Sequence, residues 1–238
     1  MTEAEWQTGT NPTAMLVHIL DRANPRKLRL FVCACARQLW ALFRDMRSRR
    51  GIEVSERYAD GQASEAERQA AWTAALEAQA DASWDATREA IAAAWTVHHD
   101  VTVGAVRVIE DVVRVHARRA ALEVARKGLW RAVRETRQAA ELLARARQCD
   151  LLRDLFGNPW RPVVIDPVWL VWNGATLAHI ARVLHDERRW EDLPVLADAL
   201  EEAGCSDEAI LSHCRAGGEH ARGCHVLDAL LGKRNLVG

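Results

Sequence analysis

The residues best suited to chemistry lie close together near the end of the chain. Between positions 205 and 224 the sequence reads CSDEAILSHCRAGGEHARGC, which holds three of the six cysteines and two of the nine histidines. Thiolate and neutral imidazole are the ligands that zinc and related borderline metals prefer. The sequence therefore predicts a zinc site at Cys205, Cys214, His220 and Cys224, with His213 as a competing ligand.

The elements expected to position this site are the two arms of a short helical hairpin. We expect one helix from Ser206 to Cys214 and another from His220 to Leu231, joined by two glycines. On a helix, His220 and Cys224 would point the same way because they are four residues apart. The competing interpretation is core packing with hydrogen-bonded histidines, since free cysteine is among the most often buried residues.

A second chemistry compatible with the same cluster is thiol catalysis. Its nucleophile would be Cys214 or Cys224, with His213 or His220 as the base and Asp228 orienting that base. The sequence contains no phosphate loop, dinucleotide fingerprint or paired-carboxylate motif. A metal- or thiol-dependent enzyme centred on this cluster is therefore an alternative function.

The rest of the chain has the patterns of consecutive helices. Thr2 with Glu5, and Ser64 with Glu67, have the spacing of capping boxes, and Asn24-Pro25 is a typical helix start. With no alternating strand pattern of useful length, we predict an all-α fold. The expected helices span residues 12–22, 25–47, 52–60, 65–97, 103–155, 176–187 and 193–203, besides the two C-terminal ones.

The two longest helices are expected to form a long antiparallel hairpin. Residues 65–97 are alanine-rich and acidic, whereas residues 103–155 are rich in arginine and allow an interruption at Gly128. Antiparallel packing would place the acidic and basic surfaces against each other. Exposed ion pairs stabilise little, so this charge pattern is expected to set partner choice rather than stability.

A change of composition after residue 155 predicts the domain organisation. The segment FGNPWRP at 156–162 cannot continue a helix, and the β-branched run VVI follows it. We expect an N-terminal helical region at 1–155, an extended connector at 156–172, and a C-terminal helical cluster at 173–238 that carries the Cys/His site.

Composition narrows the choice of partner and compartment. The 238 residues are 49% hydrophobic and 27% charged, as in a soluble globular protein, and the net charge of −1 provides no global attraction to nucleic acid or anionic membranes. No apolar run reaches the roughly 18 residues of a membrane helix, so no membrane partner is expected. The N-terminus lacks the pattern of an export signal, so we expect reduced thiols and a cytoplasmic protein.

Five segments carry a resemblance to a known family: RKLRLFVCACARQLW, SERYADG, LLRDLFGNPWRPVVIDPVWLVWNG, LPVLADALEEAGC and HCRAGGEHARGCHVLDALLGK. They resemble the conserved blocks of a family of bacterial helical proteins best known from planctomycetes, whose alanine-rich middle varies in length. The family has no established activity, so the resemblance implies no particular chemistry. Its members usually have tryptophan at the position of His225 and an extra cysteine at that of Ala36, which implies that neither position is an essential ligand.

These features favour a cytoplasmic binding or scaffold module that presents its long hairpin to a partner protein and contains a structural zinc site. The second alternative to this function is nucleic-acid binding through the arginine-rich helices. It is less favoured, because no aromatic-interleaved groove or helix-turn-helix pattern accompanies the basic residues. Those residues include Arg114, Arg118, Arg119, Arg126 and Lys127.

Overall fold

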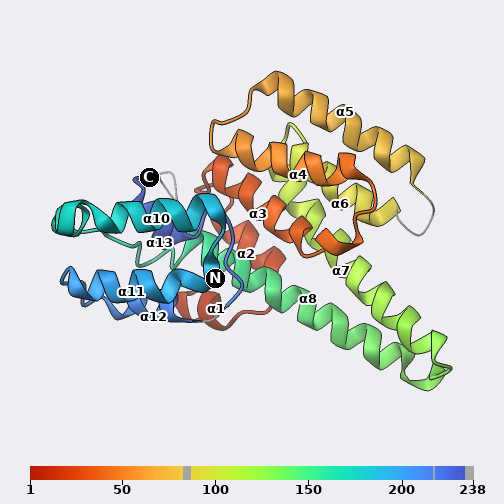
Figure 1. Ribbon diagram of the computed structural model, residues 1–238. Helices are drawn as coiled ribbons and strands as arrows, with labels where there is room; N and C mark the ends of the chain where they lie inside the picture. Colours follow the sequence, from red (N-terminus) through yellow and green to blue (C-terminus); the bar gives the residue numbers. More distant parts are fainter. Residues whose placement is uncertain (83–86, 217, 234–238) are drawn as a thin grey trace.

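The computed structural model describes residues 1–82, 87–216 and 218–233 of the chain. In this part the secondary structure is helical, apart from one isolated bridge between Asn158 and Arg161, which confirms the all-α prediction (Figure 1). None of the helices in the described part combines the length and apolarity that a bilayer crossing requires.

The N-terminal part is a bundle built around one central helix. Its helices are α1 (Glu3–Thr8), α2 (Pro12–Ile19), α3 (Pro25–Arg37), α4 (Met46–Ala59), α5 (Glu65–Asp81), α6 (Thr87–Val97), α7 (Val101–Arg126) and α8 (Val133–Phe156). Every residue of α3 from Lys27 to Ala36 is buried, because α4, α6, α7 and α8 all pack against it. A helix buried on all sides has no solvated face, and α3 is therefore the centre of the first core.

The predicted helix over residues 25–47 is wrong in its second half. Helix α3 ends at Arg37, a single helical turn follows at Trp40–Leu42, and α4 begins at Met46. The reason is local, since the Asp45 side chain accepts a hydrogen bond from the Arg47 amide and caps a new helix. Both predicted capping boxes, at Thr2 and at Ser64, are confirmed.

The structure contains a long antiparallel hairpin, but its arms are not the predicted ones. Helix α5 ends at Asp81, where Ala82 adopts an extended conformation, and α5 packs against α6 instead of continuing into it. The predicted continuity of residues 65–97 also runs through 83–86, which lie outside the described residues. The hairpin is instead formed by α7 and α8, which fold back on each other at Gly128 (φ +74°).

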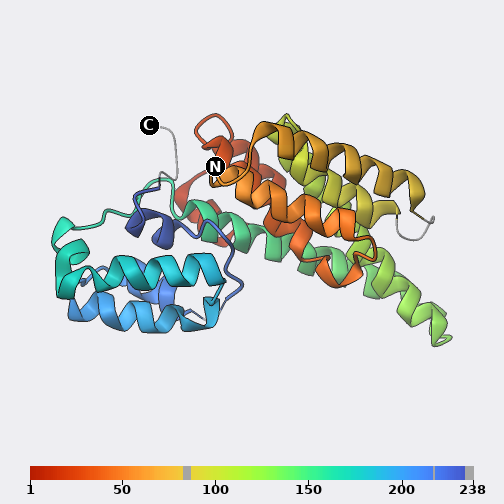
Figure 2. The same cartoon turned by 45° about the horizontal axis from the view of Figure 1, so that its top comes forward.

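The α7–α8 hairpin extends beyond the rest of the bundle. Both views show its far end, which contains Gly128, projecting past the other helices (Figures 1 and 2). Every residue from 118 to 143 is exposed or only partly buried. The distal half of the hairpin is therefore two helices that no third helix of the described residues covers.

The C-terminal part packs around a second core. After an extended stretch it comprises α9 (Pro167–Val171), α10 (Thr176–Glu187), α11 (Leu193–Glu202), α12 (Glu208–Arg215) and α13 (His225–Leu230). The predicted start of the last helix at His220 is wrong, because 220–223 is irregular and α13 begins at His225. Helix α12 begins at Glu208 and not at the predicted Ser206, because Asp207 caps it by accepting hydrogen bonds from two backbone amides.

Buried charges connect the two cores. The fully buried Lys27 on α3 lies 2.6 Å from Asp228 on α13 and donates hydrogen bonds to the carbonyl oxygens of Leu155 and Gly223. Arg26 also pairs with Asp228, at 2.6 Å. Because a buried charge is costly unless it is paired and hydrogen-bonded, these contacts fix α13 and the end of α8 against α3.

Candidate metal centre

Four side chains meet where the end of α8 contacts the C-terminal part. Asp154, His213, His220 and Cys224 each contribute one ligand atom, and these four atoms lie within 4.8 Å of one another. The His213 Nε2 atom is 3.1 Å from Cys224 Sγ and 3.4 Å from Asp154 Oδ1, and His220 Nδ1 is 2.7 Å from the same oxygen. Zinc bonds of 2.0–2.3 Å in a tetrahedron place ligand atoms roughly 3.3–3.8 Å apart, so only small movements separate this arrangement from a metal site.

Two segments far apart in the sequence supply these side chains, the end of α8 and residues 213–224. Asp154 lies in the last turn of α8 and His213 in the last turn of α12. His220 belongs to the irregular loop, and Cys224 is the residue immediately before α13. A metal at this position would link α8 to both ends of the segment that connects α12 and α13.

Glycine at position 223 allows the loop to reach this position. Gly223 has a φ of +95°, and a Cβ atom there would come within 2.7 Å of Leu30 and 3.0 Å of Leu155. Only glycine satisfies both the left-handed backbone and this close approach. The loop therefore lies directly on α3 and α8, and His220 and Cys224 reach Asp154 without the helical spacing that the sequence suggested.

A second set of contacts holds the ligands in position. Asp154 Oδ2 accepts a hydrogen bond of 2.9 Å from the Ala221 amide, so its other oxygen faces the two histidines. His225 Nδ1 donates to the Asp154 carbonyl oxygen at 2.9 Å, and its ring lies 4.3 Å from the ring of His213. Such outer contacts are typical of metal sites, where they fix ligand orientation. His225 lies outside the group of four and contacts two of its members.

The charges in the cluster depend strongly on one another. Burial disfavours the charged form of Asp154, but hydrogen bonds from His213 and His220 outweigh it and hold the pKa of this carboxyl well below its usual range. Burial likewise opposes the charging of His220, yet Asp154 and Cys224 raise its pKa to about 10. Burial and the Asp154 carboxylate raise the pKa of Cys224 to about 11. Without a metal, the cluster is thus a buried imidazolium–carboxylate pair beside a neutral thiol, and a bound cation would replace the protons.

His213 is not placed as the base of a thiol catalytic triad. In such a triad the base contacts the nucleophile through one ring nitrogen and the orienting acid through the other. Here Cys224 and Asp154 both face the same nitrogen of His213, and Asp228 pairs with Lys27 and Arg26 rather than with a histidine. The four atoms converge on one point, which is the geometry of metal binding.

Sequence reasoning identified three of the four clustered residues. Cys205 and Cys214 lie outside the group, buried among the apolar side chains of the second core, and burial raises the pKa of both thiols. Asp154 was missed because it lies about 60 residues before the other ligands. Its one local signal is an acidic residue, beside Arg153, among the apolar residues Leu151, Leu152, Leu155 and Phe156.

Comparison with known proteins adds no further assignment. No protein-family model, curated protein or solved structure matches the chain. Conclusions about function therefore depend on the geometry of the protein itself.

Proposed function

We propose that this chain is a helical binding module whose C-terminal part is fastened to α8 by one structural zinc ion. The ligands are Asp154, His213, His220 and Cys224, and the observation that carries the proposal is the convergence of their four ligand atoms within 4.8 Å. Four protein ligands complete a tetrahedral shell and leave no open position for water or substrate. The metal in this proposal is structural for that reason.

The donor atoms favour zinc over other common ions. One thiolate, two imidazoles and one carboxylate form a borderline set, whereas calcium and magnesium require mostly oxygen ligands. All six cysteines are buried and free of disulfides, which supports the reduced, cytoplasmic setting in which a zinc thiolate persists.

The binding surface in this proposal is the distal half of the α7–α8 hairpin. Trp130 is 72% exposed at its end, next to Leu129, which is 56% exposed. Residues 118–137 contain seven arginines and lysines and two glutamates, a net charge of +5 in a chain of net charge −1. Exposed tryptophan surrounded by arginine is typical of protein-binding hot spots, and the charge favours an acidic partner protein.

Elemental analysis of protein purified without a histidine tag tests the metal site. We expect about one zinc per chain in the wild type. Cys224→Ala and Asp154→Asn are expected to reduce the zinc content to near zero and to lower the melting temperature, because losing a ligand removes binding energy that folding depends on.

Cys205→Ala is the matched control for Cys224→Ala, since both thiols are buried but Cys205 lies outside the cluster. It is expected to retain its zinc and to lose less stability. A wild-type metal content near zero, or equal loss of zinc in both cysteine variants, would refute the structural zinc site.

A further inference from the structure

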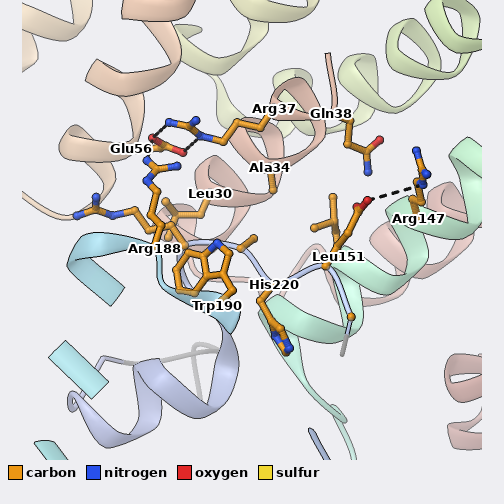
Figure 3. Close-up of a pocket in the computed structure, with 14 residues that line it drawn as sticks. Leu30, Ala34, Arg37, Gln38, Glu56, Arg147, Leu151, Arg188, Trp190 and His220 are labelled. Atoms are coloured by element: carbon orange, nitrogen blue, oxygen red, sulfur yellow. Dashed lines mark hydrogen bonds and ion pairs between the residues drawn. The ribbon is translucent and has the colours of Figure 1, made fainter. Parts of the chain in front are cut away.

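A pocket of about 330 Å³ lies between the two cores, and His220 of the four-residue cluster is part of its lining. Residues of α3, α4 and α8 form one wall, and Arg188, Trp190 and the loop 218–222 form the other (Figure 3). Small-molecule sites occupy about 300–1,000 Å³ and occur preferentially where two packed units meet. The pocket satisfies both conditions.

The floor of this pocket is apolar. Leu30, Ala34 and Leu151 line it, and each is more than nine-tenths buried. Figure 3 shows the indole of Trp190 between Arg188 and His220, with Leu30 and Ala34 above it in this view. An aliphatic or aromatic group placed here would contact the indole and these side chains, and it would be removed from water.

The amide of Gln38 is the unexplained polar group of the pocket. Its Nε2 and Oε1 atoms are both buried, and neither has a hydrogen-bond partner in the part of the chain that the structure describes. A buried amide without partners destabilises a fold, and such groups are uncommon in native proteins. A ligand that accepts from Nε2 and donates to Oε1 would satisfy both atoms.

The charge of the lining is predominantly positive. Arg37 and Arg188 share the single carboxylate of Glu56, so that wall keeps one excess positive charge. On the opposite side Arg147 lies 3.7 Å from Glu219, a loose pair whose side chains are 42% and 55% exposed. Figure 3 shows the Arg147 guanidinium on the same side of the pocket as the Gln38 amide. An anionic group would find a guanidinium and an amide donor together at this end.

We propose that this pocket binds a small organic anion, a molecule with an apolar body and one carboxylate or phosphate group. The body packs on Trp190 and Leu30, and the anionic group is bound by Arg147 and the Gln38 amide. A hydrogen-bond donor beside the anionic group, such as the N–H of an acylated amino acid, pairs with Gln38 Oε1. This binding site is distinct from the proposed zinc site and from the proposed partner-binding surface of the hairpin.

The test measures the melting temperature of the protein, and its binding affinity by titration calorimetry, with four probes. These are N-acetyl-L-leucine, phenyl phosphate, N-acetyl-L-leucinamide and inorganic phosphate. At least one of the first two is expected to raise the melting temperature in a saturable manner, because a ligand that binds the folded state stabilises it. Which of them acts identifies the anionic group. The neutral amide and inorganic phosphate, which lack the charge and the apolar body respectively, are expected to have no effect at the same concentration.

Two variants locate the binding. Arg147→Gln is expected to lower the affinity for the active probe by about tenfold or more, because a charged hydrogen bond is lost. Arg215→Gln is the matched control, since Arg215 has a similar exposure of 41%, is also ion-paired and lies on α12 away from the pocket. Gln38→Leu is expected to raise the melting temperature of the unliganded protein by about 2 °C or more and to lose binding, because it removes the unpaired amide.

The proposal is overturned by any of three results. These are no effect of either organic anion, an equal effect of inorganic phosphate, and equal weakening in the Arg147 and Arg215 variants. Zinc content is measured in every sample, because His220 belongs both to the metal cluster and to the pocket wall. Failure of the pocket proposal with zinc retained leaves the structural zinc site standing.

Discussion

Two glycines shape the backbone of the metal centre for the same physical reason. Gly223 and Gly157 both have positive φ angles and both lie where a Cβ atom would collide with a neighbour. At Gly157, which ends α8 three residues after Asp154, that neighbour is the His225 ring, at 2.7 Å. The His225 ring in turn holds the Asp154 carbonyl, so this glycine permits the outer contacts of the site.

Gly157→Ala is therefore expected to destabilise the protein more than Gly128→Ala. Both glycines have a positive φ, of +65° and +74°, which costs a residue with a side chain about 1–2 kcal/mol; at Gly157 the ψ of −146° is close to a region that glycine alone adopts, so the backbone strain there is larger. Position 128 has no atom within 4 Å of the added Cβ, whereas at 157 the His225 ring must move, which adds about 1–3 kcal/mol. Urea unfolding of the two variants measures the difference. Equal losses would show that the His225 contact is unimportant.

At the scale of elements, the α7–α8 hairpin has two halves with different environments. The half near the bundle has a buried face, on which Ile109 and Leu152 are inaccessible and Gln148 donates a hydrogen bond to the Ile109 carbonyl. The distal half has no buried residue. Stability should therefore come from the first half, and the second half can change with little effect on the fold.

Trp130→Ser is expected to leave the unfolding midpoint and the zinc content unchanged, because the Trp130 side chain is 72% exposed. It is expected to weaken binding of the proposed acidic partner protein by roughly 30-fold or more, as for a hot-spot tryptophan. A photo-crosslinking residue at position 130 identifies the partner, and the affinity is then measured with both purified proteins.

Val195 is the control for this experiment, since it is 57% exposed on α11, far from the hairpin. Crosslinking from position 195 should not capture the partner, and Val195→Ser should leave its affinity unchanged. If no protein is captured at position 130, and retention on heparin is lost in an Arg126→Glu, Lys127→Glu variant, the nucleic-acid alternative replaces the protein partner.

At the scale of the whole molecule, Asp60 joins the bundle to the C-terminal part. Its buried carboxylate lies 2.7 Å from Arg26 of α3, 2.6 Å from Arg222 and 3.1 Å from Lys233. His185 of α10 also faces it, at 3.5 Å. Burial opposes ionisation of Asp60, but Arg26 and Arg222 outweigh it and hold its pKa well below the usual range.

This lowered pKa predicts a stability that is lost in acid. The pKa of an unfolded aspartate is about 3.9, and the folded value is lower. The contribution of Asp60 to the free energy of unfolding is therefore complete above the unfolded pKa, and it disappears as the pH falls through the folded pKa. Asp60→Asn should cost about 3–5 kcal/mol at pH 7, because it removes the buried carboxylate that pairs with Arg222 and one of the two that pair with Arg26, and should flatten the fall of stability below pH 4. Urea unfolding from pH 7 to pH 3 measures both effects. An unchanged acid slope in the variant would contradict the role of Asp60.

Signals that act within one or two helical turns were readable from the sequence. The capping boxes at Thr2 and Ser64 are present, α10 has its predicted bounds of Thr176–Glu187, and α11 begins at the predicted Leu193. These elements depend on side chains that satisfy nearby backbone groups, and such pairs are adjacent in the sequence. The all-α class followed from the same local patterns.

The tertiary structure decided which helices pair and which residues meet. The sequence showed that Gly128 could interrupt a helix, but only packing makes α7 and α8 fold back on each other there. It also placed His213, His220 and Cys224 in one short segment, while the fourth member, Asp154, is brought to them by the contact of the loop with α3 and α8. Asp154 and His220 are separated by 66 residues, a distance over which local propensity carries no information, so only the burial of both cores against each other creates the site.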